Sequence, residues 1–167
     1  MQEKMATPYK SEKRKIHDDA LSPVPRKNLI FLEDGLLAGD IILLWRIQFG
    51  TFTNQTVFPK YFEYTYGINA PKHLETLIEK EYVIEESAFM SLDHIRGEEK
   101  KKILKEKGVK GLSKLKVKDL DTLLAQNFSE LELSKYFSIR GYKLTSKGKK
   151  ALESNQAVVD KHPKKNI

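Results

Sequence analysis

The hydrophobic residues of this chain are gathered into separate stretches with polar segments between them. The most apolar stretch, 36–49, is hydrophobic on nearly every helical face, so it predicts a central helix that is covered on all sides. Asp40 is a suitable N-cap residue and would start this helix at Ile41. Trp45 is expected to belong to the core.

A second group of elements is predicted after this helix. The aromatic stretch 58–66 is typical of a short helix packed on the core, although alternating aromatic residues and lysine can also stack single-stranded bases. Asn69-Ala70-Pro71 is a helix start, because proline is tolerated in the first turn. Tyr82-Val83-Ile84 predicts a short strand. The order of helix, helix and strand is that of a helix-turn-helix core that leads into its wing.

The following region is strongly charged. A helix is predicted over 98–107, where Gly108 ends it. After a lysine-rich loop, a second helix over 117–126 carries an apolar stripe at positions 117, 120, 123 and 124. Apolar residues at 128, 131 and 137 suggest a third short helix.

The last ordered segment is predicted to return to the core. Tyr142 and Leu144 have the alternation of a strand, and Thr145 can cap a helix from Ser146 to about Asn155. Residues 157–167 are polar and basic and are expected to form a tail, in which Val158-Val159 could still form a short pairing segment. Residues 1–28 have no apolar periodicity and are predicted to form a flexible basic arm.

Charge is distributed unevenly along the chain. The 167 residues have a net charge of +7, whereas nine lysines between Lys100 and Lys118 face a single acid, Glu106. A nucleic-acid backbone is a common partner for such a cluster, because each neutralised phosphate releases condensed counterions. A solvated lysine-rich face without any partner is the alternative.

Signals for catalysis, cofactors or metal ions are weak. Cysteine is absent, which excludes disulfides, thiol nucleophiles and thiolate metal sites. The four histidines have no metal-ligand spacing, and His94 is expected at the surface. The acidic residues of 75–99 form no recognisable motif, and the lysine-glycine segments lack phosphate-loop spacing. We therefore expect no catalytic residue, no metal, no cofactor and no enzymatic activity.

Membrane insertion and export are not expected either. No apolar run approaches the roughly 20 residues of a spanning helix, and the N-terminus has no signal-peptide hydrophobic region. The expected location is the cytoplasm.

Residues 101–126 resemble a SAP module, a compact helix-loop-helix that binds DNA. Ile103-Leu104-Lys105-Glu106-Lys107-Gly108-Val109-Lys110 is similar to its first helix and the glycine that follows. Lys116-Val117-Lys118-Asp119-Leu120-Asp121-Thr122-Leu123-Leu124 is similar to its second helix, although Leu115-Lys116-Val117 stands where the family has a Gly-Lys-Lys-like signature. The resemblance implies that basic residues of the loop touch DNA phosphates.

The flanking segments resemble winged-helix proteins. Residues 74–84 are similar to a helix and first wing strand, and Tyr142-Lys143-Leu144-Thr145-Ser146-Lys147-Gly148 is similar to their return strand and helix start. Together, residues 36–155 resemble a group of small SAP-domain-containing proteins of Firmicutes and their phages. The resemblance implies a mostly α fold with a small β wing, an α+β class: a winged-helix-like core over 29–97 and 140–156, with a SAP-like module over 98–139.

The first functional hypothesis is a non-enzymatic protein that binds nucleic acid, above all double-stranded DNA. Lysine point charges favour contacts to the phosphate backbone with low sequence specificity, and the N-terminus of the second helix favours an anion. The candidate binding residues are Lys110, Lys114, Lys116, Lys118, Lys143, Lys147, Lys149 and Lys150. The alternative is a protein-protein adaptor of phage or mobile-element origin, which would dock through the acidic 75–99 surface and the aromatic 58–66 stretch. The oligomeric state is left open.

Overall fold

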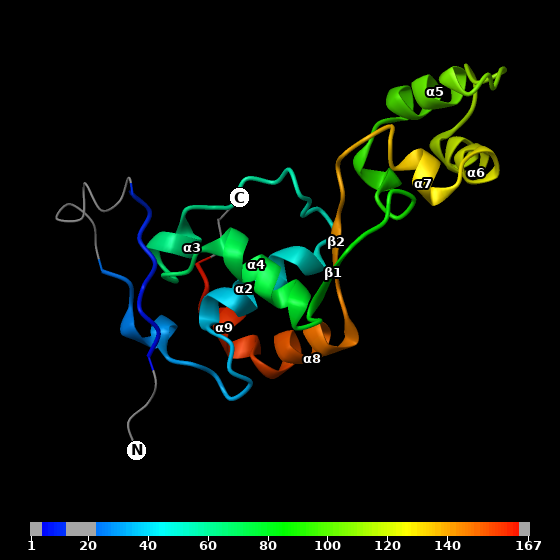
Figure 1. Cartoon of the computed structure of the whole chain (residues 1–167). Helices are drawn as coiled ribbons and strands as arrows, with labels where there is room; N and C mark the ends of the chain where they lie inside the picture. Colours follow the sequence, from blue (N-terminus) through cyan, green and yellow to red (C-terminus); the bar gives the residue numbers. More distant parts are fainter. Residues whose placement is uncertain (1–4, 13–22, 164–167) are drawn as a thin grey trace. The chain divides into compact units, whose positions relative to one another are not determined.

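A computed structural model describes residues 5–12 and 23–163 of the chain. Internal contacts divide the chain into two compact units. Figure 1 shows the chain coloured along its sequence from blue to red. The core unit comprises residues 1–50, 57–84 and 143–167, and the inserted unit comprises 51–56 and 85–142. The predicted helical module, 98–139, thus lies within the inserted unit.

A buried helix organises the core unit. Helix α2 (Ala38–Gln48) contacts α4 (Ala70–Glu79), α8 (Ser146–Ser154) and α9 (Gln156–Lys161). Its four central side chains, Ile41, Ile42, Leu43 and Leu44, have no solvent exposure. These partners explain why α2 has almost no polar face, as the sequence predicted. The remaining helical segments are η2 (Arg26–Leu29) and α3 (Tyr61–Tyr64).

The start of α2 differs from the prediction. Leu37, not Asp40, is the N-cap residue, and the helix begins three residues before Ile41. The Asp40 carboxylate lies at the third helical position and accepts a hydrogen bond from the Leu37 N–H at 2.9 Å. An acid at this position can satisfy the N-terminal N–H groups as well as an N-cap side chain does, so the choice of cap was wrong by one turn.

The return segment begins where the sequence placed it. Strand β2 (Tyr142–Leu144) pairs with β1 (Val83–Glu85) in a two-stranded antiparallel sheet. Thr145 caps α8, because its Oγ1 accepts from the Gly148 N–H at 3.1 Å and donates to the Glu81 carbonyl oxygen at 2.6 Å. A Cβ at position 148 would overlap the Tyr82 carbonyl oxygen. The glycine is therefore required by close packing.

The two ends of the described chain pack on the core unit more than expected. In the predicted flexible arm, the Ala6 N–H donates to the Leu29 carbonyl oxygen and the Tyr9 N–H donates to that of Gly67, each at 2.8 Å. Residues 156–161, part of which was predicted to be a tail, form α9, whose Val159 is buried. The prediction of a pairing segment at Val158-Val159 was wrong, because these residues are helical.

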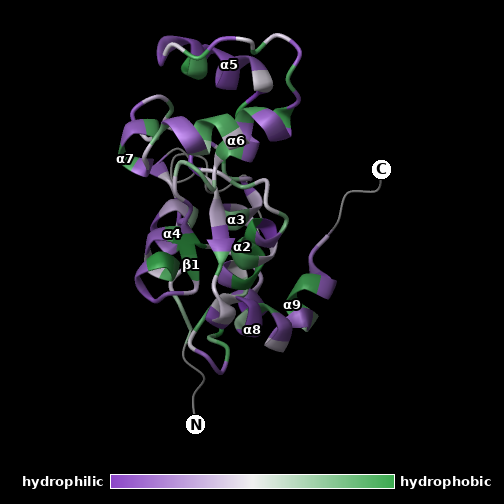
Figure 2. Ribbon diagram, turned by 90° about the vertical axis from the view of Figure 1, so that its right-hand side faces the viewer, coloured by the Kyte–Doolittle hydropathy of each residue, from purple (hydrophilic) through white to green (hydrophobic). Residues whose placement is uncertain are grey.

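The inserted unit has its own small core. It contains η3 (Leu92–His94), α5 (Gly97–Glu106), α6 (Val117–Asn127) and α7 (Glu130–Leu133). Figure 2 shows hydrophilic and hydrophobic residues along both α5 and α6. Val117, the first residue of the predicted apolar stripe, is exposed. The core of the unit is a cluster of Ala88, Leu92, Ile95, Ile103, Leu104, Leu112, Leu120, Leu124, Phe128 and Leu133.

The coarse fold prediction is confirmed. The described residues are mostly helical with one small sheet, which is an α+β arrangement. No helix in this described part of the chain has the length and hydrophobicity needed to cross a membrane.

Candidate nucleic-acid interface

Helices α5 and α6 form the scaffold of the candidate interface, and a lysine lies inside the contact between them. The Lys100 side chain is 1% exposed, and its Nζ lies 2.7 Å from Oδ1 of Asp121 on α6. Lys100 shares the apolar face of α5 with Ile103 and Leu104, which are three and four residues further along the helix. This ion pair fixes α5 against α6 and removes one lysine from the surface.

The loop between α5 and α6 encloses a basic hollow of about 360 Å³. Leu112 is buried and anchors the loop to the hydrophobic cluster, and Gly111 has a φ of 78°, a backbone conformation that favours glycine. The Lys101 ammonium donates to the Ser113 carbonyl oxygen at 3.3 Å and so spans the hollow. The hollow is lined by Lys101, Lys105, Val109, Lys110, Gly111, Leu112 and Ser113. We call this site the loop hollow.

No acidic side chain lines the loop hollow. Lys105 and Lys110 are exposed and form no ion pair with any residue that the structure describes. Three ammonium groups without a carboxylate beside them create a local positive potential, and such a site attracts an anion.

The predicted lysines of this region differ in position. Lys110 lines the loop hollow, whereas Lys114 lies outside it on the same loop. Lys116 is the N-cap residue of α6 and Lys118 lies in its first turn. All four are exposed, and none of them pairs with an acid among the described residues.

The N-terminus of α6 is less open to an anion than the sequence suggested. Asp119 lies at the third helical position, and its carboxylate accepts from the Lys116 N–H at 3.3 Å. This carboxylate already provides negative charge at the positive end of the helix dipole. The loop hollow is therefore the better anion site of the two.

The other four predicted lysines belong to the core unit. Lys143 is exposed on β2, and Lys149 and Lys150 are exposed on α8. Lys147 has a structural role, since its Nζ donates to the Lys80 carbonyl oxygen at 2.7 Å and lies 4.3 Å from the centre of the Tyr82 ring. It is less available to a ligand than the other three.

Sequence reasoning missed two lysines of the loop hollow, and the nine-lysine segment that it identified includes Lys100 and Lys107, which the fold pairs with acids. Lys101 and Lys105 were not among the predicted binding residues, although their spacing of four places them on one helical face. Lys107 pairs with Glu132 at 2.7 Å and lies 5.1 Å from the Phe128 ring centre. This hydrogen bond raises the pKa of Lys107 and lowers the pKa of Glu132.

The aromatic stretch 58–66 packs inward, as the core interpretation predicted. Phe62 and Tyr66 are buried, and burial is the main reason that the pKa of Tyr66 is raised to about 12. Trp45 is only partly buried and lies edge-on to the Phe49 ring at 5.2 Å. Residues 58–66 therefore offer few exposed aromatic rings on which bases could stack or a protein partner could dock.

His94 was expected at the surface, and this prediction was wrong. Its side chain is 9% exposed, and its Nε2 lies 4.0 Å from Oε1 of Glu86 and 3.7 Å from Oδ1 of Asp93. A Cβ at position 141 would overlap both the Glu86 carboxylate and the His94 ring, so Gly141 closes the backbone over this group. The close approach of Gly141 accounts for the burial of the His94 ring. No described contact places a nucleophile beside this ring.

Comparisons with models of protein families, with curated proteins and with solved structures found no match. The chemistry of the site therefore rests on its own residues.

Among the described residues, no group of three or more histidines and acids lies in a position to hold a metal ion. Lysine ammonium groups act as point charges on flexible stems, and they fix the geometry of a base contact less well than the planar guanidinium of arginine. This arrangement suits holding phosphate, without reading base edges.

Proposed function

We propose that the inserted unit binds the phosphate backbone of nucleic acid, above all duplex DNA, with low sequence specificity and without catalysis. The observation that carries the proposal is the loop hollow, which is lined by Lys101, Lys105 and Lys110 and by no acid. Lys114, Lys116 and Lys118 continue along the same loop and the start of α6, so they extend the basic surface beyond the hollow.

We also propose the finer fold description that the sequence resemblance implies. Helix α4 leads directly into β1, and β2 leads directly into α8, which is the order of a winged-helix core with its wing strands. Helices α5 and α6 and their loop have the order of a SAP-like module within the inserted unit. In this description the winged-helix-like core carries the module that holds DNA.

Fluorescence anisotropy with duplex DNA, single-stranded DNA and RNA at two or more salt concentrations tests the function. We expect binding to duplex to weaken steeply with salt, since each phosphate contact contributes about 0.9 to the slope of log affinity against log salt. The double variant Lys105→Gln/Lys110→Gln should reduce that slope by about 1.8. Lys135→Gln is the matched control, because Lys135 is an exposed lysine of the same unit outside the loop hollow.

Two results would refute the proposal. The first is an absence of duplex binding at low ionic strength. The second is an unchanged slope in the double variant when the control also has no effect, because the loop hollow would then make no phosphate contact. Two results together would support the adaptor alternative: the parent protein does not bind DNA, and a protein partner stays bound after charge reversal of Lys114, Lys116 and Lys118.

A further inference from the structure

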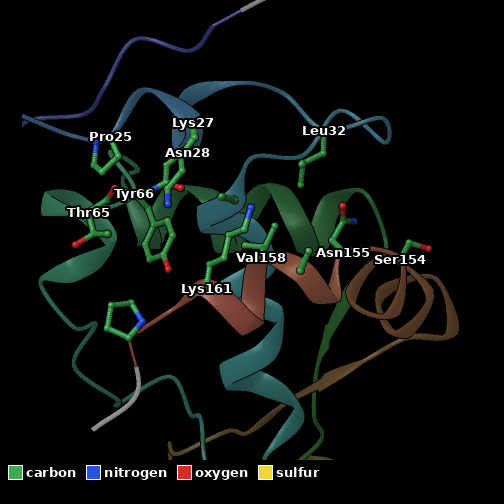
Figure 3. A pocket seen from close by; sticks show the side chains of 13 residues that line it. Pro25, Lys27, Asn28, Leu32, Thr65, Tyr66, Ser154, Asn155, Val158 and Lys161 are labelled. Carbon is green, nitrogen blue, oxygen red and sulfur yellow. Dashed lines mark hydrogen bonds between the residues drawn. The ribbon is translucent and has the colours of Figure 1, made fainter.

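The core unit contains a second, larger hollow that the proposed nucleic-acid function does not use. This pocket has a volume of about 480 Å³ and is lined by residues of η2, of α9 and of the turn that follows α3 (Figure 3). We call it the α9 pocket. Its size falls within the range of small-molecule sites, which is about 300–1,000 Å³.

The walls of the α9 pocket are mainly apolar. Pro25, Leu32 and Val158 contribute aliphatic surface, and the ring of Tyr66 forms part of the wall. The Tyr66 hydroxyl shares a hydrogen bond with Nδ1 of the buried His162, which holds the ring in place. The apolar part of a ligand that enters this pocket is removed from water, which stabilises the complex by about 25 cal/mol per Å² of apolar surface buried.

The charged groups that line the α9 pocket are both cationic, beside neutral polar residues such as Asn28 and Asn155. Lys27 comes from η2 and Lys161 from the last turn of α9, and both line the pocket. Figure 3 shows the Lys161 side chain extending from α9 into the pocket. Neither lysine forms an ion pair with a residue that the structure describes.

Two acids that are close in sequence to the lining residues form hydrogen bonds with other groups. The Asp34 carboxylate accepts from the Asn155 side chain at 3.1 Å and from the Leu36 N–H at 3.2 Å. The Asp160 carboxylate accepts from the Gln156 amide at 3.1 Å. Neither acid lines the pocket, so an apolar hollow is left with two positive charges and no negative one.

From this combination we infer that the α9 pocket binds a small amphipathic anion, in which an apolar body fills the hollow and a carboxylate or phosphate group meets Lys27 and Lys161. A cation would be repelled by both lysines, and a small inorganic anion would leave the apolar walls exposed to water. A neutral apolar molecule would gain the burial but not the ion pairs. The inference does not depend on nucleic-acid binding by the inserted unit.

Isothermal titration calorimetry of the full chain tests the inference with four decyl probes below their micelle-forming concentrations. Decanoate and decyl phosphate are the two anionic arms, and they distinguish a carboxylate from a phosphate ligand. Decylammonium and decanol are the charge controls. We expect at least one anion to bind with a stoichiometry of one and a Kd below about 1 mM, and both controls to bind at least about fivefold more weakly.

Two substitutions at position 157 give a matched pair. Ala157 lines the pocket from the exposed side of α9, four residues before Lys161. Ala157→Glu places a carboxylate where it can pair with Lys161, and this i, i+4 pair should support the helix. Ala157→Gln has nearly the same shape without the charge. Anion binding should weaken about fivefold in Ala157→Glu relative to Ala157→Gln, with helical circular dichroism unchanged in both.

A third variant locates the charge contact. Lys161→Gln should weaken the anion about threefold or more, whereas Lys72→Gln, an exposed lysine of α4 outside the pocket, should leave it unchanged. The inference is overturned if neither anion binds, if decylammonium binds as tightly as the anions, or if Ala157→Glu and Ala157→Gln bind equally well. None of these outcomes depends on whether DNA binds.

Discussion

The ion pair between Lys100 and Asp121 makes a strong prediction, because it joins α5 to α6 beneath the candidate interface. The Lys100 ammonium is buried, whereas the Asp121 side chain is 39% exposed. The contact is an ion pair at 2.7 Å, and Asp121 Oδ1 receives no hydrogen bond of normal geometry. Asp121→Asn keeps the shape of the side chain and leaves the lysine charge buried without a countercharge.

The expected cost follows from the burial of the two groups. Removing one partner of a fully buried pair costs about 3–5 kcal/mol, but solvent that reaches Asp121 screens part of the charge, and exposed pairs are worth about 1 kcal/mol or less. We therefore expect Asp121→Asn to lower the free energy of unfolding by about 2 kcal/mol. For a chain of this size, that loss lowers the Tm by about 4–8 °C.

Thermal and urea unfolding, followed by circular dichroism, check this prediction. The double variant Lys100→Met/Asp121→Asn removes both charges and should recover most of the loss, because an apolar side chain of similar length suits the buried site. Lys102→Met is the control, since Lys102 is exposed on the same helix and should change stability by less than about 0.5 kcal/mol. The reasoning fails if Asp121→Asn matches the parent, or if the double variant is no more stable than Asp121→Asn.

Two further predictions concern the core unit. Gly148→Ala should destabilise the protein by about 1–3 kcal/mol in urea unfolding, because the added methyl group overlaps the Tyr82 carbonyl oxygen; a gain of stability, as for an ordinary helix glycine, would contradict the packing. Tyr66 should ionise at a pKa of about 12, above its ordinary value of 10.0 because of burial. The neutral hydroxyl therefore stabilises the fold fully below pH 10, and this contribution is lost as the pH rises toward 12. Absorbance titration at alkaline pH should show a late component that Tyr66→Phe removes, and its persistence in that variant would assign it to another tyrosine.

The sequence predicted best those features that depend on a few neighbouring residues. Thr145 caps α8 as predicted, and the helix start predicted at Asn69-Ala70-Pro71 is where α4 begins, with the Asn69 side chain accepting a hydrogen bond there. The strand at 142–144 also follows directly from its alternation, since Tyr142 and Leu144 are buried and Lys143 is exposed. Each of these signals is local, so tertiary packing had little to change.

Features that depend on distant partners were predicted less well. Asp40 lies inside α2 and not at its N-cap, and its Oδ1 lies 2.6 Å from Nδ1 of His73 on α4, a distant residue of the chain. The burial of His94 depends on Gly141, which is far away in the chain. The loop hollow depends on how Leu112 anchors the loop between two helices. Only the shared face of Lys101 and Lys105 was present in the sequence as a signal for that site.

The formal charge of the lysine-rich segment overstates what it presents to a partner. Lys100 is neutralised by Asp121 and Lys107 by Glu132, so these two contribute little to the outer field. The lysines of the loop hollow and the following loop keep their charge free of described acids. Lys100 and Lys107 thus face acids of α6 and α7, whereas no acid lines the loop hollow. This separation favours an anion partner, and it predicts that the salt slope of binding responds to Lys105 and Lys110 but not to a charge change that leaves the loop hollow intact.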